Sequence, residues 1–172
     1  MCLRIILSFL PNKLLSAKYM NMDAIDKKII SELQRDGRLS NQDLAALVGL
    51  SPSPCLRRVR RLEQAGILAG YTALVDPEKL GLPINVFVNI RMEKPDPELI
   101  KSFERAIKKI DEVIECYLMT GSRDYLLHVV SEDLKSYENL VRERLAAIPG
   151  VLSLESSFAF GRVKNTHALP IK

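Results

Sequence analysis

The first part of the chain places apolar residues at the three- and four-residue spacing of amphipathic helices. One helix is predicted between Asp23 and Asp36, with Gly37 after its end. Its apolar face comprises Ile25, Ile29, Ile30 and Leu33. A second, short helix is predicted after Ser40, a favoured N-cap residue, and it ends at Gly49, where a tight turn requires a residue that tolerates positive φ. The pattern therefore predicts two helices joined by a few residues.

A third amphipathic helix is predicted beyond this turn, with Ser51 as its N-cap and Pro52 at its first position. At about 100° per residue, Val59 and Leu62 lie within about 40° of Cys55 and form an apolar stripe. The opposite face is polar and carries Ser53, Arg57, Arg60 and Arg61, with Arg58 on its flank. An apolar stripe opposite a cationic one is the layout of a helix that lies in the major groove of DNA.

A helix that merely exposes its arginines to solvent would show the same stripe. The helices predicted upstream are therefore needed to favour DNA binding. With the glycine turn before the basic helix, they predict a helix-turn-helix DNA-binding domain over residues 22–66. Base-edge contacts are expected from Ser53, Pro54 and Arg57, and phosphate contacts from Arg38, Arg60 and Arg61. The full predicted DNA-binding set is Arg38, Ser51, Ser53, Pro54, Arg57, Arg58, Arg60 and Arg61.

The second half of the chain changes from helical to alternating periodicity. Residues 67–83 are predicted to be a linker with a short strand at 67–75, because Pro and Gly in the run 76–83 break regular structure. From Ile84 to Met92 apolar and polar residues alternate, as in a half-buried strand. The elements predicted from there on are strand 84–92, helix 98–110, strands 113–120 and 124–131, helix 134–148 and strand 151–160.

This order predicts an α+β fold, in which a ferredoxin-like βαββαβ domain over residues 84–165 follows the helix-turn-helix domain. Two helices would cover one face of the sheet, and residues 166–172 would form a tail. Phe87 falls on the other face, which suggests burial against a second copy of the sheet. A dimer would pair two recognition helices about one turn of DNA apart, and its operator would be near-palindromic.

The chain as a whole is only weakly basic, because 25 Lys and Arg against 21 Asp and Glu leave a net charge of +4. Attraction to DNA would therefore come mainly from the arginine-rich helix. The three cysteines lie far apart and fit no disulfide framework, so reduced thiols in the cytoplasm are expected. An apolar run at residues 3–10 is too short to span a bilayer. Met20 or Met22, directly before the first helix, is a more natural beginning, so residues 1–21 are predicted to be an upstream extension with no role in the fold. No membrane partner is expected.

Catalytic chemistry finds little support in this sequence. His128 and His167 are the only histidines, and His128 is more simply a packed or surface residue of a strand. The sequence shows no His/Cys cluster with metal spacing, no G-x-S-x-G and no glycine-rich phosphate loop after a strand. The chain is expected to be a binding protein rather than an enzyme, with no metal and no cofactor.

Several short motifs are distributed along both predicted domains. They are Ile25-Asp26, Ile29-Ile30, Leu33 to Ser40, Val48 to Pro52, Cys55-Leu56, Arg58 to Glu63, Gly66-Ile67, Gly70 to Leu74, Glu115-Cys116, Gly121, Asp124 to Leu127 and Pro149 to Val151. From about residue 22 to residue 164 the chain thereby resembles the Lrp/AsnC, or feast/famine, family. The resemblance implies a transcription regulator with an amino-acid-sensing second domain. It also implies dimers built sheet to sheet and often joined into octamers.

The resemblance further implies an effector site between dimers, beside the turn that joins the second and third strands of the domain. An amino acid such as leucine or methionine is expected there, with Asp124 pairing with its ammonium and backbone N–H groups around Gly121 receiving its carboxylate. Asp124 also fits a turn residue that bonds its own backbone. The predicted effector set is Leu118, Met119, Thr120, Gly121, Ser122, Arg123, Asp124, Tyr125 and Phe158.

The turn departs from the family pattern Gly-Asp-x-Asp, since this chain has Ser122 and Arg123 at the two middle positions. Arg123 fits two interpretations: it binds an effector carboxylate, or it forms a salt bridge with a neighbouring subunit. A second function also fits the whole sequence. In that alternative the chain is an amino-acid-sensing regulatory module that acts on a partner protein, with the helical part as its docking element.

Overall fold

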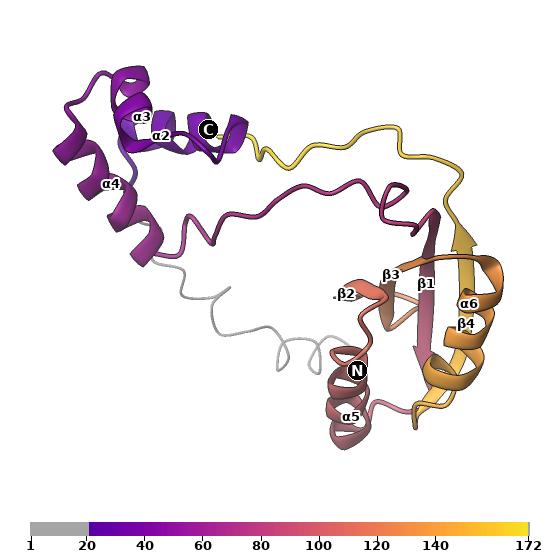
Figure 1. Cartoon of the computed structure of the whole chain (residues 1–172). Coiled ribbons are helices and arrows are strands. Elements are labelled where there is room, and N and C mark those ends of the chain that lie inside the picture. The colour runs from indigo at the N-terminus through magenta and orange to yellow at the C-terminus, as the bar shows by residue number, and fades with distance from the viewer. Residues whose placement is uncertain (1–20, 172) are drawn as a thin grey trace. The chain divides into compact units, whose positions relative to one another are not determined.

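The computed structural model describes residues 21–171, which divide into two compact units (Figure 1). Residues 21–72 form the first unit together with residues 166–171, and residues 73–165 form the second. The segment expected to be a separate tail thus groups with the helical unit. The predicted extension over residues 1–21 lies, apart from Asn21, outside the described residues.

The first unit consists of α2 (Ala24–Arg35), α3 (Asn41–Val48) and α4 (Pro52–Gln64). Asp23 begins α2 by accepting a hydrogen bond from the Asp26 N–H, and the Asp26 side chain accepts one from the Asp23 N–H in return. The Ser40 side chain caps α3 by accepting a hydrogen bond from the Asp43 N–H, and Gly49 ends that helix at φ 77°. The core residues are Ile29, Leu44, Ala45, Val48, Cys55 and Leu62. The predicted helix-turn-helix is therefore formed.

The predicted strand at residues 67–75 is wrong. Within the described part of the chain, residues 67–83 contain only turns, bends and irregular segments. A strand exists only where it hydrogen-bonds to a neighbouring strand. The sheet of the second unit consists of four other strands, so the apolar pattern of this segment does not produce one here.

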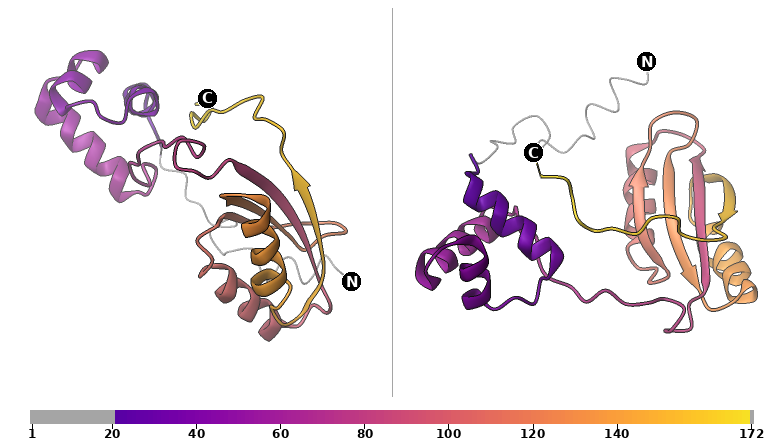
Figure 2. Two further views of the ribbon diagram at one scale, coloured as in Figure 1. Left: turned by 45° about the vertical axis from the view of Figure 1, so that its right-hand side comes forward. Right: turned by 90° about the horizontal axis from the view of Figure 1, so that it is seen from above.

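The second unit follows the order β1 (Ile84–Met92), α5 (Pro97–Ile107), β2 (Val113–Leu118), β3 (Tyr125–Ser131), α6 (Leu134–Asn139) and β4 (Val151–Phe158). One further helical segment, Leu140–Leu145, continues α6 in π-helical geometry. The strands form an antiparallel sheet in the order β2-β3-β1-β4, and both helices lie on one face of it (Figure 2). This is the predicted ferredoxin-like arrangement, with several elements two or three residues shorter than predicted.

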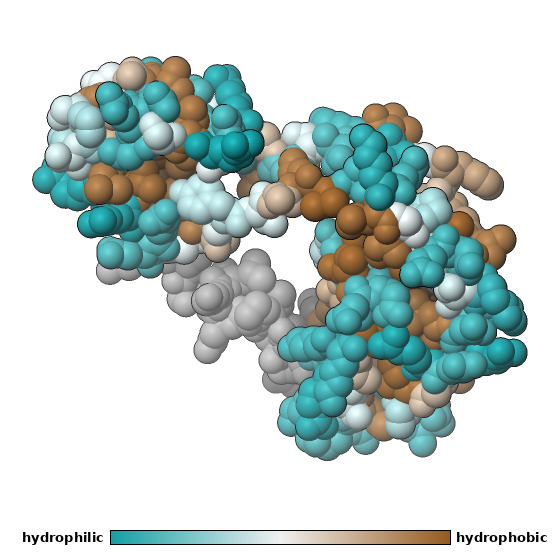
Figure 3. Space-filling model, in the orientation of Figure 1, coloured by the Kyte–Doolittle hydropathy of each residue, from teal (hydrophilic) through white to brown (hydrophobic). Residues whose placement is uncertain are grey.

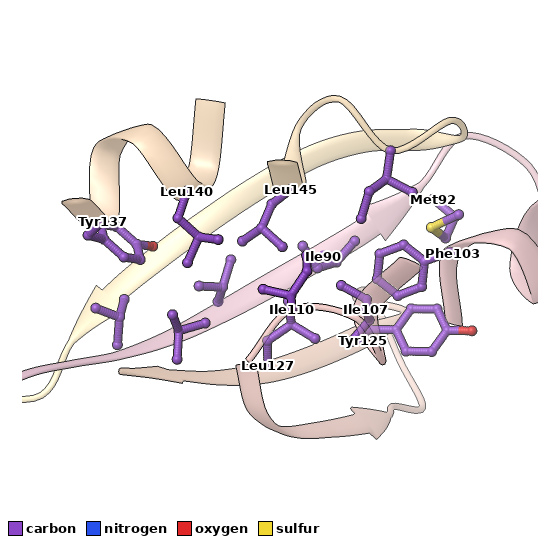
Figure 4. Close-up of a cluster of buried hydrophobic side chains, with 14 residues drawn as sticks. Ile90, Met92, Phe103, Ile107, Ile110, Tyr125, Leu127, Tyr137, Leu140 and Leu145 are labelled. Atoms are coloured by element: carbon purple, nitrogen blue, oxygen red, sulfur yellow. The ribbon is translucent and has the colours of Figure 1, made fainter. Parts of the chain in front are cut away.

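The alternation along β1 divides the sheet into a covered and an open face. Val86, Val88, Ile90 and Met92 are buried in a cluster that packs against both helices (Figure 4). Phe87 is 36% exposed on the open face. Hydrophobic surface is visible on the second unit (Figure 3), whose exposed apolar residues include Ile114, Tyr117, Leu118, Leu152 and Phe158. No helix in the described part of the chain is long and apolar enough to cross a membrane.

Candidate DNA interface and effector site

Helix α4 buries its apolar stripe and exposes the opposite side. Cys55 and Leu62 are fully buried, whereas Ser53, Arg57 and Arg60 are exposed. A surface hollow of about 580 Å³ follows this helix and is lined by Ser53, Leu56, Arg57, Arg58, Arg60, Arg61 and Gln64. Arg57 and Arg60 form no ion pair with any residue between 21 and 171. Their guanidinium groups are free to meet an external anion.

Arg58 and Arg61, which the sequence groups with the predicted DNA-contacting residues, form ion pairs with carboxylates of α2 and its N-cap. Arg58 donates to Asp26 Oδ1 at 2.8 Å and to Asp23 Oδ2 at 2.7 Å, and Arg61 donates to Asp26 Oδ2 at 2.5 Å. Both arginines lie on the flank of α4 that faces α2, within reach of two carboxylates. They therefore have partners inside the unit.

The contact between Asp23 and Arg58 shifts the pKa of both groups. A hydrogen bond from the Asp26 N–H, followed by the contact with Arg58, lowers the pKa of Asp23. The Asp23 and Asp26 carboxylates raise the pKa of Arg58. A signal for this cluster was present in the sequence, because Asp26 lies three and four residues before the apolar Ile29 and Ile30 and so shares their inward face.

The start of α4 is held by α3 rather than by its own cap. Ser51 occupies the predicted N-cap position, but its side chain makes no capping hydrogen bond. The Asn41 side chain instead donates to the Pro52 carbonyl at 2.9 Å, which joins the starts of the two helices. Pro54 is half-buried, and Arg38 is exposed in the loop before α3. These contacts fix the end of α4 at which base recognition is predicted.

The turn between β2 and β3 carries most of the predicted effector residues. Leu118, Met119, Thr120, Gly121 and Ser122 are all exposed. Gly121 adopts φ 112°, and its Cα faces open space. The turn is closed by a hydrogen bond from the Met119 N–H to the Asp124 carbonyl at 2.8 Å. Backbone groups and apolar side chains thus meet at an accessible surface.

Asp124 connects this turn to β1. Its N–H donates to the Ile90 carbonyl at 2.9 Å, and its Oδ2 accepts from the Met92 N–H at 2.7 Å. The suggestion that Asp124 bonds its own turn is therefore wrong, because its side chain bonds a different strand. Arg123 forms an ion pair with Glu155 of β4 in the same chain. It already has a carboxylate partner within the chain, which neither interpretation of Arg123 anticipated.

Two residues of the predicted effector set lie away from the accessible turn. Tyr125 is buried in the core: its ring lies 4.5 Å from Phe103 between centroids, and its hydroxyl donates to Glu104 at 3.1 Å. Burial raises the pKa of this phenol. Phe158 pairs with Val86 at the opposite end of β1 from Met92, and it contacts Tyr137. One chain therefore does not bring Phe158 to the turn.

His128 forms a cluster that sequence reasoning did not describe. It is 6% exposed on the open face of the sheet, where its ring stacks on Phe87 at 4.7 Å between centroids. Its Nε2 lies 2.6 Å from Asn85 Oδ1, and its Nδ1 lies 3.3 Å from Glu115 Oε2. In residues 21–171, no group of three or more His, Cys, Asp or Glu side chains is arranged to hold a metal ion. The cluster is a packed hydrogen-bonded group on the sheet.

Comparison with known proteins matches each of the two units to a known domain family. A profile described as a winged helix-turn-helix DNA-binding domain matches residues 22–69, and one described as the Lrp/AsnC ligand binding domain matches residues 85–169. The leucine-responsive regulatory protein of Escherichia coli is 43% identical over 152 residues, which cover 88% of this chain and 93% of the relative. The chain belongs to the Lrp/AsnC family. It is thus a transcriptional regulator with a DNA-binding and an amino-acid-binding domain, and not an enzyme.

Solved structures of other Lrp/AsnC-type proteins have the same fold. A transcriptional regulator from Neisseria meningitidis, solved as a complex with L-Met, is 37% identical with a TM-score of 0.84; the match covers 87% of this chain and 97% of that one. An AsnC family regulator from Agrobacterium tumefaciens is 39% identical with a TM-score of 0.81, and the match again covers 87% of this chain and 97% of that one. The predicted family and fold class are confirmed.

Proposed function

We propose that this Lrp/AsnC regulator binds near-palindromic operators in the cytoplasm as a dimer, with α4 of each chain in the major groove. The exposed side of α4 carries this proposal: Ser53, Pro54 and Arg57 lie at its first turns, where base edges are read, and Arg60 lies one turn further on. Arg57 is free to form a bidentate contact with guanine. Arg38, Arg60 and the exposed Ser51 are suited to phosphates. The free thiols of Cys55 and Cys116 fit a reducing compartment.

The dimer is proposed to form through the open face of the sheet, and octamers to form from dimers. Phe87 and Tyr117 remain exposed on this face although large apolar groups gain free energy when they are buried. In a dimer with two-fold symmetry, each chain contributes the same surface to the interface. The open face of a second chain would therefore bury these residues. Phe158, exposed at the sheet edge, would then contribute to an effector site only from a neighbouring chain.

Leucine or methionine is the proposed effector, bound beside the β2–β3 turn. The relative in Escherichia coli is named for its response to leucine, and the neighbour from Neisseria meningitidis was solved with L-Met. In this chain Leu118 and Met119 offer an apolar surface to such a side chain. The Asp124 carboxylate accepts from Met92 through one oxygen and keeps the other for an ammonium group. Amide groups around Gly121 are left for the carboxylate.

DNA binding is tested by titrating the intact chain onto the DNA upstream of its own gene and onto a scrambled duplex of the same length. The expected result is preference for the upstream DNA and a slope of log K against log salt concentration of about −0.9 for each phosphate contacted. Equal binding to both duplexes, or a flat slope, would favour the alternative module that acts on a partner protein. Calorimetric titration with the twenty amino acids tests the effector. If none of them gives a heat of binding, the proposal of an amino-acid effector is wrong.

A further inference from the structure

Asp26 is the buried charge on which the orientation of α4 depends. Its carboxylate is 0% exposed, and each oxygen has an arginine of α4 as partner. Oδ1 accepts from Arg58 at 2.8 Å, and Oδ2 accepts from Arg61 and, at 3.2 Å, from the Asp23 N–H. A buried carboxylate is tolerated only with such partners, because its desolvation is costly. The two helices are therefore joined by charge as well as by apolar packing.

The ion pairs also determine how much positive charge α4 offers to a ligand. Arg58, with its side chain 25% exposed, is shared between Asp23 and Asp26, and the half-exposed Arg61 is held by Asp26. Two guanidinium groups thus face two carboxylates. Among the described residues, Arg57 and Arg60 have no such partner. About half of the arginine charge of this helix is neutralised inside the unit.

The position of the paired arginines fixes the rotation of α4 about its axis. Arg58 lies one turn beyond the buried Cys55, and Arg61 lies beside the buried Leu62. Held against α2 at two successive turns, the helix directs Ser53 and Arg57 outward. Free arginines at positions 58 and 61 would instead reach for phosphates of any sequence.

We propose that Asp26 is a specificity-determining positioning residue of the DNA interface, which withholds Arg58 and Arg61 from the phosphate backbone. The proposal rests on the proposed placement of α4 in the major groove. With Asp26 neutral, one or both arginines become available to phosphates. Binding to random DNA then strengthens, while the contacts that read sequence gain nothing. The ratio of operator to random affinity falls as a result.

The direct test compares Asp26→Asn with Asp43→Asn in the intact chain. Asp43 is exposed on α3 and hydrogen-bonds Ser40, so its variant carries the same change in net charge without releasing an arginine. For Asp26→Asn the salt slope on a random duplex is expected to steepen by about 0.9 to 1.8, one or two phosphates. A slope equal to that of folded Asp43→Asn would overturn the proposal.

A second pair of variants keeps the proposal testable if Asp26→Asn does not fold. Arg60→Met is expected to reduce the salt slope by about 0.9, because Arg60 is free to contact phosphate. Arg61→Met is expected to leave the slope unchanged, because its charge is held by Asp26. Equal losses in the two variants would show that Arg61 binds phosphate and would overturn the proposal. If the unaltered chain shows no operator preference, the proposed function fails instead.

Discussion

The Oδ2 atom of Asp124 accepts a hydrogen bond from the backbone N–H of Met92 at 2.7 Å. This contact joins the β2–β3 turn to the end of β1, beside an irregularity in the β1–β4 register between Arg91 and Met92. The turn at which the effector is proposed to bind is thereby fixed to β1, an interior strand of the sheet. The Asp124 carboxylate thus stabilises the fold and is also proposed to bind the ammonium group of the effector. Substitutions at this position can separate the two roles.

Asp124→Ala is expected to destabilise the second unit by about 1–3 kcal/mol, because it leaves the N–H of the buried Met92 without an acceptor. Asp124→Asn keeps an acceptor oxygen and is expected to lose less. Urea unfolding measures both losses of stability.

Calorimetry tests the proposed ligand role of Asp124. Asp124→Asn should weaken amino-acid binding, because the amide lacks the charge that attracts an ammonium group. Unchanged binding in Asp124→Asn would leave Asp124 with the structural role alone.

Arg57→Ala is expected to weaken operator binding by about 1–3 kcal/mol and to relax the preference at one base pair, because the contact is proposed to be bidentate to guanine. Arg38→Ala is the matched variant, with an exposed arginine outside α4. It should weaken binding to all sequences equally. Affinities for a set of operators with single base changes distinguish the two. Uniform weakening in Arg57→Ala would reassign that residue to the phosphate backbone.

Gly150→Ala is expected to cost more stability than Gly49→Ala, although both glycines have positive φ, 87° and 77°. The conformation alone costs an alanine about 1–2 kcal/mol. A Cβ at position 49 meets open space, but at position 150 it would lie 3.2 Å from side-chain atoms of Leu99 and Met92. The added crowding should raise the loss by about 1 kcal/mol or more. Equal losses in thermal unfolding would contradict this account of Gly150.

Asp133 begins α6 by accepting a hydrogen bond from the Ser136 N–H at 2.6 Å, and this bond lowers the pKa of Asp133 from 3.8. A carboxyl with a lowered folded pKa stabilises the fold above its unfolded pKa, and that contribution is lost as pH falls through the folded value. Asp133→Asn keeps a capping oxygen but does not titrate. Its free energy of unfolding should therefore fall less steeply than that of the unaltered chain below about pH 4. Parallel pH profiles would rule out the charged cap.

The fold was predictable from sequence because its signals are local. The apolar spacing around Ile29, the turn at Gly49 and the alternation from Ile84 to Met92 each act over a few residues. Helix ends were less predictable, since Ser51 stands at a cap position without making the cap bond. The segment at residues 67–75 carried a strand pattern, but a strand also needs a partner that a local pattern does not supply.

The sites were harder to predict because their geometry depends on long-range contacts. Arg58 and Arg61 look like their neighbours in sequence, and only the packing of α4 on α2 gives them Asp26. Tyr125 directly follows the β2–β3 turn, where the effector is proposed to bind, yet strand alternation directs it into the core. Phe158 is placed by the register of β4 on β1, which the sequence does not reveal.

Hydroxyl-radical footprinting of the DNA upstream of its own gene, bound by the intact chain, tests the central claim that the exposed side of α4 reads sequence. Two-fold related protections centred about one helical turn apart are expected on one face of the duplex, and they should be lost at the same protein concentration in Arg57→Ala. Protection that covers the duplex evenly, or that is unchanged in Arg57→Ala, would contradict it.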